Sequence, residues 1–253
     1  DLFGGPPRKS ESELTQREMD LAASVQKVTE DILIDIAKDI ANETGEKNLC
    51  LAGGVALNCV ANGILVREKI FENIWIQPAA GDAGGALGAA LSTWYLHHRN
   101  ERTLSSERDA MKGAYLGPEY GDNEIESKLN GCGAVFKKLS EEELIEEVAT
   151  ALSSEKAIGW MQGRMEFGPR ALGARSIIAD PRSPNMQKQL NLKVKYRESF
   201  RPFAPSVLNE YVNDWFEHDS ESPYMLLVAD VKKDKHYKCS SKLPQYFYEF
   251  LLG

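Results

Sequence analysis

The sequence predicts a mixed protein of the α/β and α+β classes, and three observations support this prediction. A short apolar run, a glycine turn and a helical pattern follow one another twice between residues 49 and 98. Residues 99–113 contain almost no core-forming side chains, which is typical of a surface connection between domains. Beyond that connection, helical patterns and short strand-like runs continue without a sustained internal repeat.

The first expected element is a helix over residues 19–40. Its apolar residues recur at spacings of three and four, while the acidic residues fall mostly on the other side. The apolar stripe consists of Leu21, Val25, Val28, Ile32, Ile36 and Ile40. This stripe predicts a helix that packs against a core.

Two strand, turn and helix units come next. They comprise 49–51, 53–54 and 60–70, and then 74–76, 81–85 and 86–98. A glycine turn directly after each short apolar run predicts an α/β layer with glycine loops at the ends of its strands.

The second half predicts helices over 124–129 and 141–152 and strands over 157–161 and 224–231. Ser140, followed three residues later by Glu143, indicates a capping box at the start of the second helix.

Composition excludes several classes of protein. The 253 residues carry a net charge of −8, so a general affinity for nucleic acid or for anionic membranes is not expected. The four cysteines form no CxxC pair, which argues against a disulfide scaffold and a thiolate zinc site. No apolar run approaches the roughly 18–20 residues that span a bilayer, and no signal peptide is recognisable, so we expect a cytoplasmic protein.

The basic residues are concentrated in one segment, 163–202. It holds nine basic residues against three acidic ones, a net charge of +6, so the rest of the chain carries −14. The basic residues are Arg164, Arg170, Arg175, Arg182, Lys188, Lys193, Lys195, Arg197 and Arg201. Because guanidinium groups bind phosphate in a bidentate manner, phosphate binding is the favoured interpretation. A solvated basic face, internal ion pairs and nucleic-acid binding are the alternatives.

The glycine turns, and the aspartate between the glycines of the second turn, have two interpretations each. Gly53 and Gly54 would let the backbone approach a ligand closely, yet small residues also serve close helix packing, which suits 84–90 well. Asp82 could cap the helix that follows it or could ligate a metal ion. His97 and His98 lie too far along the same helix to share a metal with Asp82.

Four strings in the chain resemble the carbamoyltransferases of the nodulation and antibiotic O-carbamoylation type. They are 51–58 (LAGGVALN), 81–90 (GDAGGALGAA), 163–173 (GRMEFGPRALG) and 195–208 (KYRESFRPFAPSVL). The likeness runs from about residue 15 to about residue 230.

The resemblance implies two modules joined by a connecting segment. Residues 1–100 look like the second half of an actin-like ATPase fold (ASKHA, Kae1-like), 101–138 form the linker, and 139–253 look like part of a YrdC-like domain. In such proteins the YrdC-like domain converts ATP and carbamoyl phosphate into carbamoyl-adenylate. The actin-like domain then passes the carbamoyl group to a hydroxyl of a small molecule, near a bound metal that is generally iron.

The resemblance also implies roles for individual residues. Expected contacts to phosphate and carbamoyl phosphate in catalysis are Arg170, Lys195 and Arg201. Expected supporting contacts are Arg164, Arg175, Ser176 and Arg197. Expected nucleotide contacts are Gly53, Gly54, Asn58 and Gly84. Asp82 is the expected metal ligand, and ATP with magnesium is the expected co-substrate.

The chain also departs from the family pattern. The metal-binding histidine pair of the family's first half has no counterpart, and Ala174 stands where an asparagine is usual. The chain begins without methionine, so we expect it to be a piece of a longer protein that lacks full transferase activity alone. The alternatives are a tRNA threonylcarbamoyl-type enzyme and a nucleotide-binding protein without catalysis.

Overall fold

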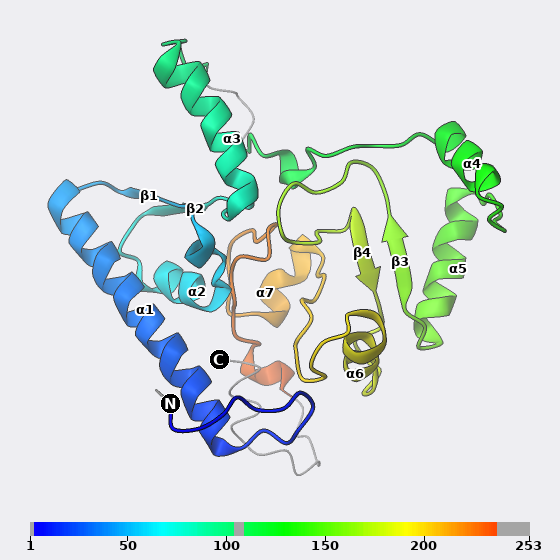
Figure 1. The fold of residues 1–253 in the computed structure, drawn as a ribbon, viewed down its shortest axis with the longest axis horizontal. Coiled ribbons are helices and arrows are strands. Elements are labelled where there is room, and N and C mark those ends of the chain that lie inside the picture. Colours follow the sequence, from blue (N-terminus) through cyan, green and yellow to red (C-terminus); the bar gives the residue numbers. More distant parts are fainter. Residues whose placement is uncertain (1–2, 104–108, 237–253) are drawn as a thin grey trace. The chain divides into compact units, whose positions relative to one another are not determined.

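The computed structural model describes residues 3–103 and 109–236, which form two compact units (Figure 1). The first unit is built from residues up to Ala86 together with those from Pro202 onward, and the second is Leu87–Arg201. The first unit therefore combines two separated stretches of chain. The module boundaries expected from the family resemblance stay a prediction, because compactness in space does not test them.

Helix α1 (Gln16–Thr44) opens the first unit and is delimited by its own sequence. At its start, the Glu18 carboxylate accepts a hydrogen bond from the Thr15 amide at 3.1 Å, as in a capping box. At its end, Gly45 adopts a left-handed conformation and its amide bonds to the Ala41 carbonyl. The predicted helix is thus confirmed and extends beyond 19–40 at both ends.

The packing face of α1 differs from the predicted one. Ala37 lies in the core with Leu65 and Phe71, and the part-buried residues beside it on α1 are Leu33, Ile34 and Ala41. The predicted stripe from Val25 to Ile40 stays between 39% and 59% exposed. The helix has apolar residues on more than one face, so the three-four spacing did not identify the face that the core uses.

A parallel pair of strands lies beside this helix. Strands β1 (Asn48–Leu51) and β2 (Asn73–Ile76) pair from Asn48 opposite Asn73 to Leu51 opposite Ile76. Helix α2 (Cys59–Glu68) connects them after a 3₁₀ turn (Gly54–Leu57), and it packs on α1. The strands and helices of the two predicted units are confirmed, but the second glycine turn, predicted over 81–85, is wrong because the helix after β2 already begins at Asp82.

Helix α3 (Asp82–Ser92) follows β2 and continues into a π-helical turn, Thr93–His97. No residue of α3 is buried, and Leu91, Trp94 and Leu96 are between 45% and 74% exposed.

The strand predicted over 224–231 is wrong. Only Val231 forms an isolated bridge, with Phe216, and Met225 has a positive φ of 52° that interrupts an extended run. The carbonyls of Leu226 and Val228 instead accept bonds from the α2 side chains Asn62 and Arg67. This segment therefore docks on a helix rather than joining a sheet. The part of the first unit from Pro202 onward also contains α7 (Val212–Trp215) and the 3₁₀ turns Asn209–Tyr211 and Lys233–Lys235.

The second unit contains helices and an antiparallel hairpin. Its elements are the 3₁₀ turn Lys112–Ala114, α4 (Asp122–Gly131), α5 (Glu141–Ser153), β3 (Ile158–Met161), β4 (Arg175–Ile178), α6 (Met186–Gln189) and the π turn Leu190–Val194. The capping box of Ser140 and Glu143 is confirmed at the start of α5. Strand β4, which the glycine-rich and proline-rich composition concealed, pairs with β3 from Ile158 opposite Ile178 to Met161 opposite Arg175.

The architecture is a mixed α/β one with two small sheets, which confirms the fold class at that level. Within the described ranges, no helix combines the length and apolarity needed to cross a membrane. Cys50, Cys59 and Cys132 are free thiols, and Cys239 lies outside the described residues.

Candidate functional site

The structure brings the two glycine loops of the first unit together. Since β1 and β2 are parallel, the loops that follow them leave the same edge of the sheet. The Gly53 amide donates a hydrogen bond to the Ala80 carbonyl at 2.8 Å, which joins the loops directly. Gly53 has a φ of 97°, a conformation that favours glycine. Gly53, Gly54 and Asp82 therefore belong to one edge.

Asp82 is exposed and lies in the first turn of α3. Its carboxylate is available at a helix N-terminus, where a negative charge is favourable. Among the described residues no group of three or more His, Cys, Asp or Glu side chains is placed to hold a metal ion. The described residues thus do not form a complete metal site, and Asp82 could supply one ligand only.

Two of the predicted nucleotide contacts have packing roles. A Cβ atom on Gly84 would lie 2.0 Å from the Ala79 carbonyl oxygen, so the start of α3 requires glycine there. Asn58 caps α2 by accepting from the Ala61 amide at 3.1 Å, and its side chain is also bonded to Gln26 on α1. These contacts explain both residues without a nucleotide.

The loop that joins β3 to β4, residues 162–174, carries two of the predicted arginines of the second unit, Arg164 and Arg170. Gly163, Gly168 and Gly173 have φ values of 51°, 134° and 104°, so glycine is favoured at each bend. The Tyr115 hydroxyl donates to the Leu172 carbonyl at 2.6 Å, and the Gly173 amide donates to Ser176 Oγ at 2.9 Å. The loop is thus fixed by its own glycine bends and by hydrogen bonds to Tyr115 and Ser176, which lie outside it.

Glu166 is the residue that holds this loop closed, and sequence reasoning treated it only as an acidic residue in a basic segment. Its Oε1 accepts backbone bonds from Leu172 at 2.7 Å, Ala174 at 2.8 Å and Arg175 at 3.2 Å. Burial, the largest influence, would raise the pKa of Glu166, but backbone amides beginning with that of Leu172 outweigh it and lower the pKa below its ordinary value. The group is therefore a carboxylate at neutral pH.

The predicted supporting residues differ in what their side chains contact. The Arg175 guanidinium donates to the carbonyls of Gln162 at 3.1 Å and Ala174 at 2.9 Å, and also bonds to Gly163 and Pro118. Arg164 donates to the Gly117 carbonyl at 3.1 Å and stands 3.7 Å from the Glu119 carboxylate. Arg175 therefore has a clear architectural role, whereas Arg164 is held on the surface by one carbonyl and one distant carboxylate.

A hollow of about 490 Å³ lies beside this loop. It is bounded by Tyr115, Glu119, Gln162, Gly163, Arg164 and Ala174. Arg164 thus lines a space that a small polar molecule could enter. Ala174, the departure from the family pattern, is buried in the same wall.

Three further predicted basic residues, Lys195, Arg197 and Arg201, follow the π turn. Asn191 is fully buried, and its amide donates to the carbonyls of Ser199 at 3.1 Å and Arg201 at 2.7 Å, while its Oδ1 accepts from Arg197 Nε at 2.6 Å. Burial, and then the charge of Arg201, lower the pKa of Arg197, so these two arginines are close enough to repel. Lys195 is exposed at the end of the turn. Sequence patterns did not reveal Asn191, which organises this group.

One arginine of the basic segment is satisfied by an internal ion pair. Arg182 forms a bidentate contact with Asp180, with Nη2 at 2.6 Å from Oδ2. This contact lowers the pKa of Asp180 to about 2. The internal-pair alternative therefore applies to Arg182, which was not among the predicted contacts.

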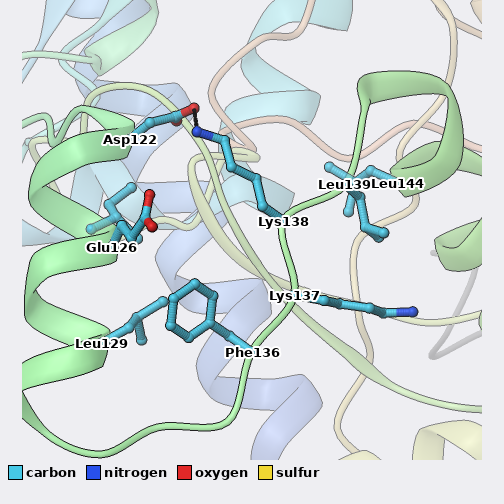
Figure 2. A pocket seen from close by; sticks show the side chains of 9 residues that line it. Asp122, Glu126, Leu129, Phe136, Lys137, Lys138, Leu139 and Leu144 are labelled. Atoms are coloured by element: carbon cyan, nitrogen blue, oxygen red, sulfur yellow. Dashed lines mark ion pairs between the residues drawn. The ribbon is translucent and has the colours of Figure 1, made fainter.

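A second hollow, of about 350 Å³, lies away from the predicted residues. Figure 2 shows it between α4 and the segment that leads to α5, with Leu129 and Phe136 on its apolar side and an ion pair between Lys138 and Asp122. The charged atoms of this pair lie 3.2 Å apart. None of the predicted site residues lines it.

Comparison with known proteins covers both halves of the chain. Residues 1–91 match the family model of the carbamoyltransferase N-terminus, and residues 149–245 match that of the carbamoyltransferase C-terminus.

Several relatives are similar over nearly the whole chain. An uncharacterised protein of Synechocystis sp. is 58% identical over 98% of this chain and 40% of its own length. Nodulation protein NolNO of Sinorhizobium fredii is 44% identical over 90% of this chain and 33% of its own length. Nodulation protein NolO of Bradyrhizobium diazoefficiens is 39% identical, over 90% of this chain and 41% of its own length. The chain thus spans 33–41% of the length of these relatives.

The two family models match in the expected order. The N-terminal model covers the sheet edge that carries Gly53, Gly54 and Asp82, and the C-terminal model covers the β3–β4 loop, residues 162–174. This chain belongs to the carbamoyltransferase family.

Proposed function

We propose that this chain is part of an ATP-dependent O-carbamoyltransferase that uses carbamoyl phosphate to carbamoylate a hydroxyl group of a small molecule. Family membership supports the transfer of a carbamoyl group. The observation that carries the finer proposal is the fixed β3–β4 loop with its arginines, within the region that matches the C-terminal model.

The electrostatics of the second unit favour anionic substrates. Arg197 and Arg201 repel one another, so an anion that contacts both would relieve an unfavourable interaction already present in the protein. Arg164 adds a guanidinium beside the neighbouring hollow. Carbamoyl phosphate and ATP both carry the negative charge that such groups bind, and fixed cations lower the cost of bringing two anions together.

The proposed chemistry has two steps. In the first, ATP and carbamoyl phosphate give carbamoyl-adenylate. For the atoms to balance, pyrophosphate leaves from ATP and the phosphate of carbamoyl phosphate is also lost, with water supplying the oxygen. In the second, the acceptor hydroxyl attacks the carbamoyl carbon and AMP leaves.

The first unit is proposed to bind the adenylate for the second step. The glycine edge formed by Gly53 and Gly54 offers backbone amides without side-chain obstruction, since a Cβ atom at either position would meet nothing within 4 Å. Under this proposal the unit has an actin-like architecture and the second a YrdC-like one. Asp82 remains a proposed metal ligand, and no step is assigned to the metal.

Titration calorimetry of the 253-residue chain with carbamoyl phosphate, with and without ATP, tests the proposal. We expect binding of both molecules, and we expect Arg170→Ala to weaken carbamoyl phosphate binding at least about tenfold, the effect of losing one charge-assisted contact.

Arg182→Ala is the matched control. It removes the same charge from the same segment, but its guanidinium is already paired with Asp180, so affinity is expected to change little. Equal weakening by both substitutions would show that only the overall charge matters. Unchanged affinity in Arg170→Ala would contradict the assigned contact, and no binding by the unmodified chain would contradict the proposed use of carbamoyl phosphate by these residues.

A further inference from the structure

Glu166 is the only charged side chain that is buried among residues 3–103 and 109–236, with 8% of its surface exposed. A buried carboxylate is costly unless several donors compensate for the lost water. Here one oxygen accepts three backbone amides, from Leu172, Ala174 and Arg175. These three hydrogen bonds offset the cost of burying the charge, and they also fix the backbone that donates them.

The amides of Leu172 and Ala174 lie at one end of the 162–174 loop and that of Arg175 begins β4, whereas Glu166 lies nearer the middle of the loop. The side chain therefore closes residues 166–172 into a ring, and Arg170 is carried within that ring. Gly168 provides one bend with a φ of 134°, but a glycine by itself leaves the backbone free to take other conformations. The carboxylate supplies the constraint that the glycine lacks.

The side chains of Tyr115, Ser176 and Arg175 act near the ends of the loop. Tyr115 and Ser176 contact Leu172 and Gly173, and Arg175 contacts Gln162 and Gly163. Within the stretch that contains Arg170, the Phe167 amide also donates to the Ala114 carbonyl at 2.7 Å. Unlike that bond, the bonds of Glu166 join the two sides of Arg170 to each other.

We propose that Glu166 is a positioning residue: its carboxylate fixes the 166–175 backbone so that the Arg170 guanidinium is presented to carbamoyl phosphate. The role of Arg170 in this proposal rests on the function proposed above. Glu166 itself does not contact the substrate. A negatively charged substrate would be repelled by an exposed carboxylate, and the burial of Glu166 behind three donors shields that charge.

Two substitutions separate the acceptor role from the charge. Glu166→Gln keeps an oxygen at the same distance from the backbone, and Glu166→Ala removes it. In Glu166→Ala we expect amide hydrogen exchange at Leu172, Ala174 and Arg175 to accelerate about tenfold or more and carbamoyl phosphate affinity to fall about tenfold, the scale of one lost hydrogen bond. In Glu166→Gln we expect both quantities to remain within about threefold of the unmodified chain.

Asn62→Ala controls for general destabilisation. Asn62 is likewise buried, and its side-chain amide donates to two backbone carbonyls, but it lies in the first unit. This variant is expected to lower the melting temperature while leaving carbamoyl phosphate affinity and exchange at the three loop amides unchanged.

The outcomes are distinguishable. The positioning role would be overturned if Glu166→Ala bound carbamoyl phosphate as tightly as the unmodified chain. It would also be overturned if Asn62→Ala lost as much of this affinity as Glu166→Ala. If the unmodified chain binds no carbamoyl phosphate, the proposed function fails, and hydrogen exchange alone then decides whether Glu166 fixes the loop. Unchanged exchange in Glu166→Ala would overturn the loop constraint whatever the binding result.

Discussion

At the residue scale, the neighbours of a position decide which residue types it can hold. Gly84 and Gly85 are adjacent in α3 and identical in type, yet they have opposite surroundings. A Cβ at Gly84 would overlap the Ala79 carbonyl, whereas a Cβ at Gly85 would meet nothing within 4 Å. The two positions therefore predict substitutions of opposite effect.

Gly84→Ala is expected to lower the free energy of unfolding by about 1–3 kcal/mol, because backbone must move to admit the methyl group. Gly85→Ala is expected to raise it by about 0.5–1 kcal/mol through better helix propensity. Urea denaturation of both variants provides the measurement. A neutral Gly84→Ala would mean that this glycine is not needed for packing, and its predicted nucleotide role would then gain weight.

The residue scale also shows what sequence patterns could not reveal. Basic residues are visible as a local excess of charge, and the loop glycines as a composition. Glu166 and Asn191 hold their loops by hydrogen bonds to backbone groups six to ten positions away, and no spacing rule identifies such partners. Arg175 illustrates the converse: its type suggested phosphate binding, but four carbonyls surround its guanidinium.

At the scale of elements, the helices that are specified by signals in their own sequence could be predicted. The helices over 16–44 and 141–153 have periodic apolar residues and capping signals, and both were expected. The strand expected over 224–231 failed because a run of apolar residues does not specify its partner. Here the partner is α2, which presents Asn62 and Gly63 to the backbone of 226–228.

Asn62→Ala tests this docking. The substitution removes the bonds to the Ala56 and Leu226 carbonyls and leaves both carbonyls buried without these donors, so we expect a loss of about 1–3 kcal/mol in the free energy of unfolding. Asn73→Ala is the control, because its bond to Asn48 is exposed, and a change within about 0.5 kcal/mol is expected. Chemical denaturation followed by Trp fluorescence suits both variants. Equal losses would show that the Asn62 bonds contribute no more than surface ones.

At the scale of the whole molecule, the division into units differs from a simple division of the sequence. The first unit takes residues from both ends of the chain, and the second is continuous. The Trp75 ring meets the Tyr224 ring edge-on at 6.1 Å, and Arg67 bonds to the Val228 carbonyl at 3.2 Å, so contacts across about 150 residues complete the first unit.

A chain that ends at Arg201 is therefore expected to lose stability in its first unit and to retain the second. In hydrogen exchange, amides of α2 should lose protection while those of β3 and β4 keep it. A chain that ends at His236 retains all the described contacts and serves as the control. Full protection of α2 in the shorter chain would contradict the assignment of residues 202–236 to the first unit.

The discontinuity of the first unit also has a consequence for biosynthesis. The polypeptide emerges from the ribosome in order, and neighbouring stretches pair sooner than distant ones because closing a long loop costs more entropy. The interrupting unit, Leu87–Arg201, is complete before Leu226 has been translated, whereas α2 must wait for it with Asn62 and Gly63 uncovered. Maturation is thus expected to proceed from the inserted part outward, and the exposed flank of α2 is the place where chaperone contact would be of most use.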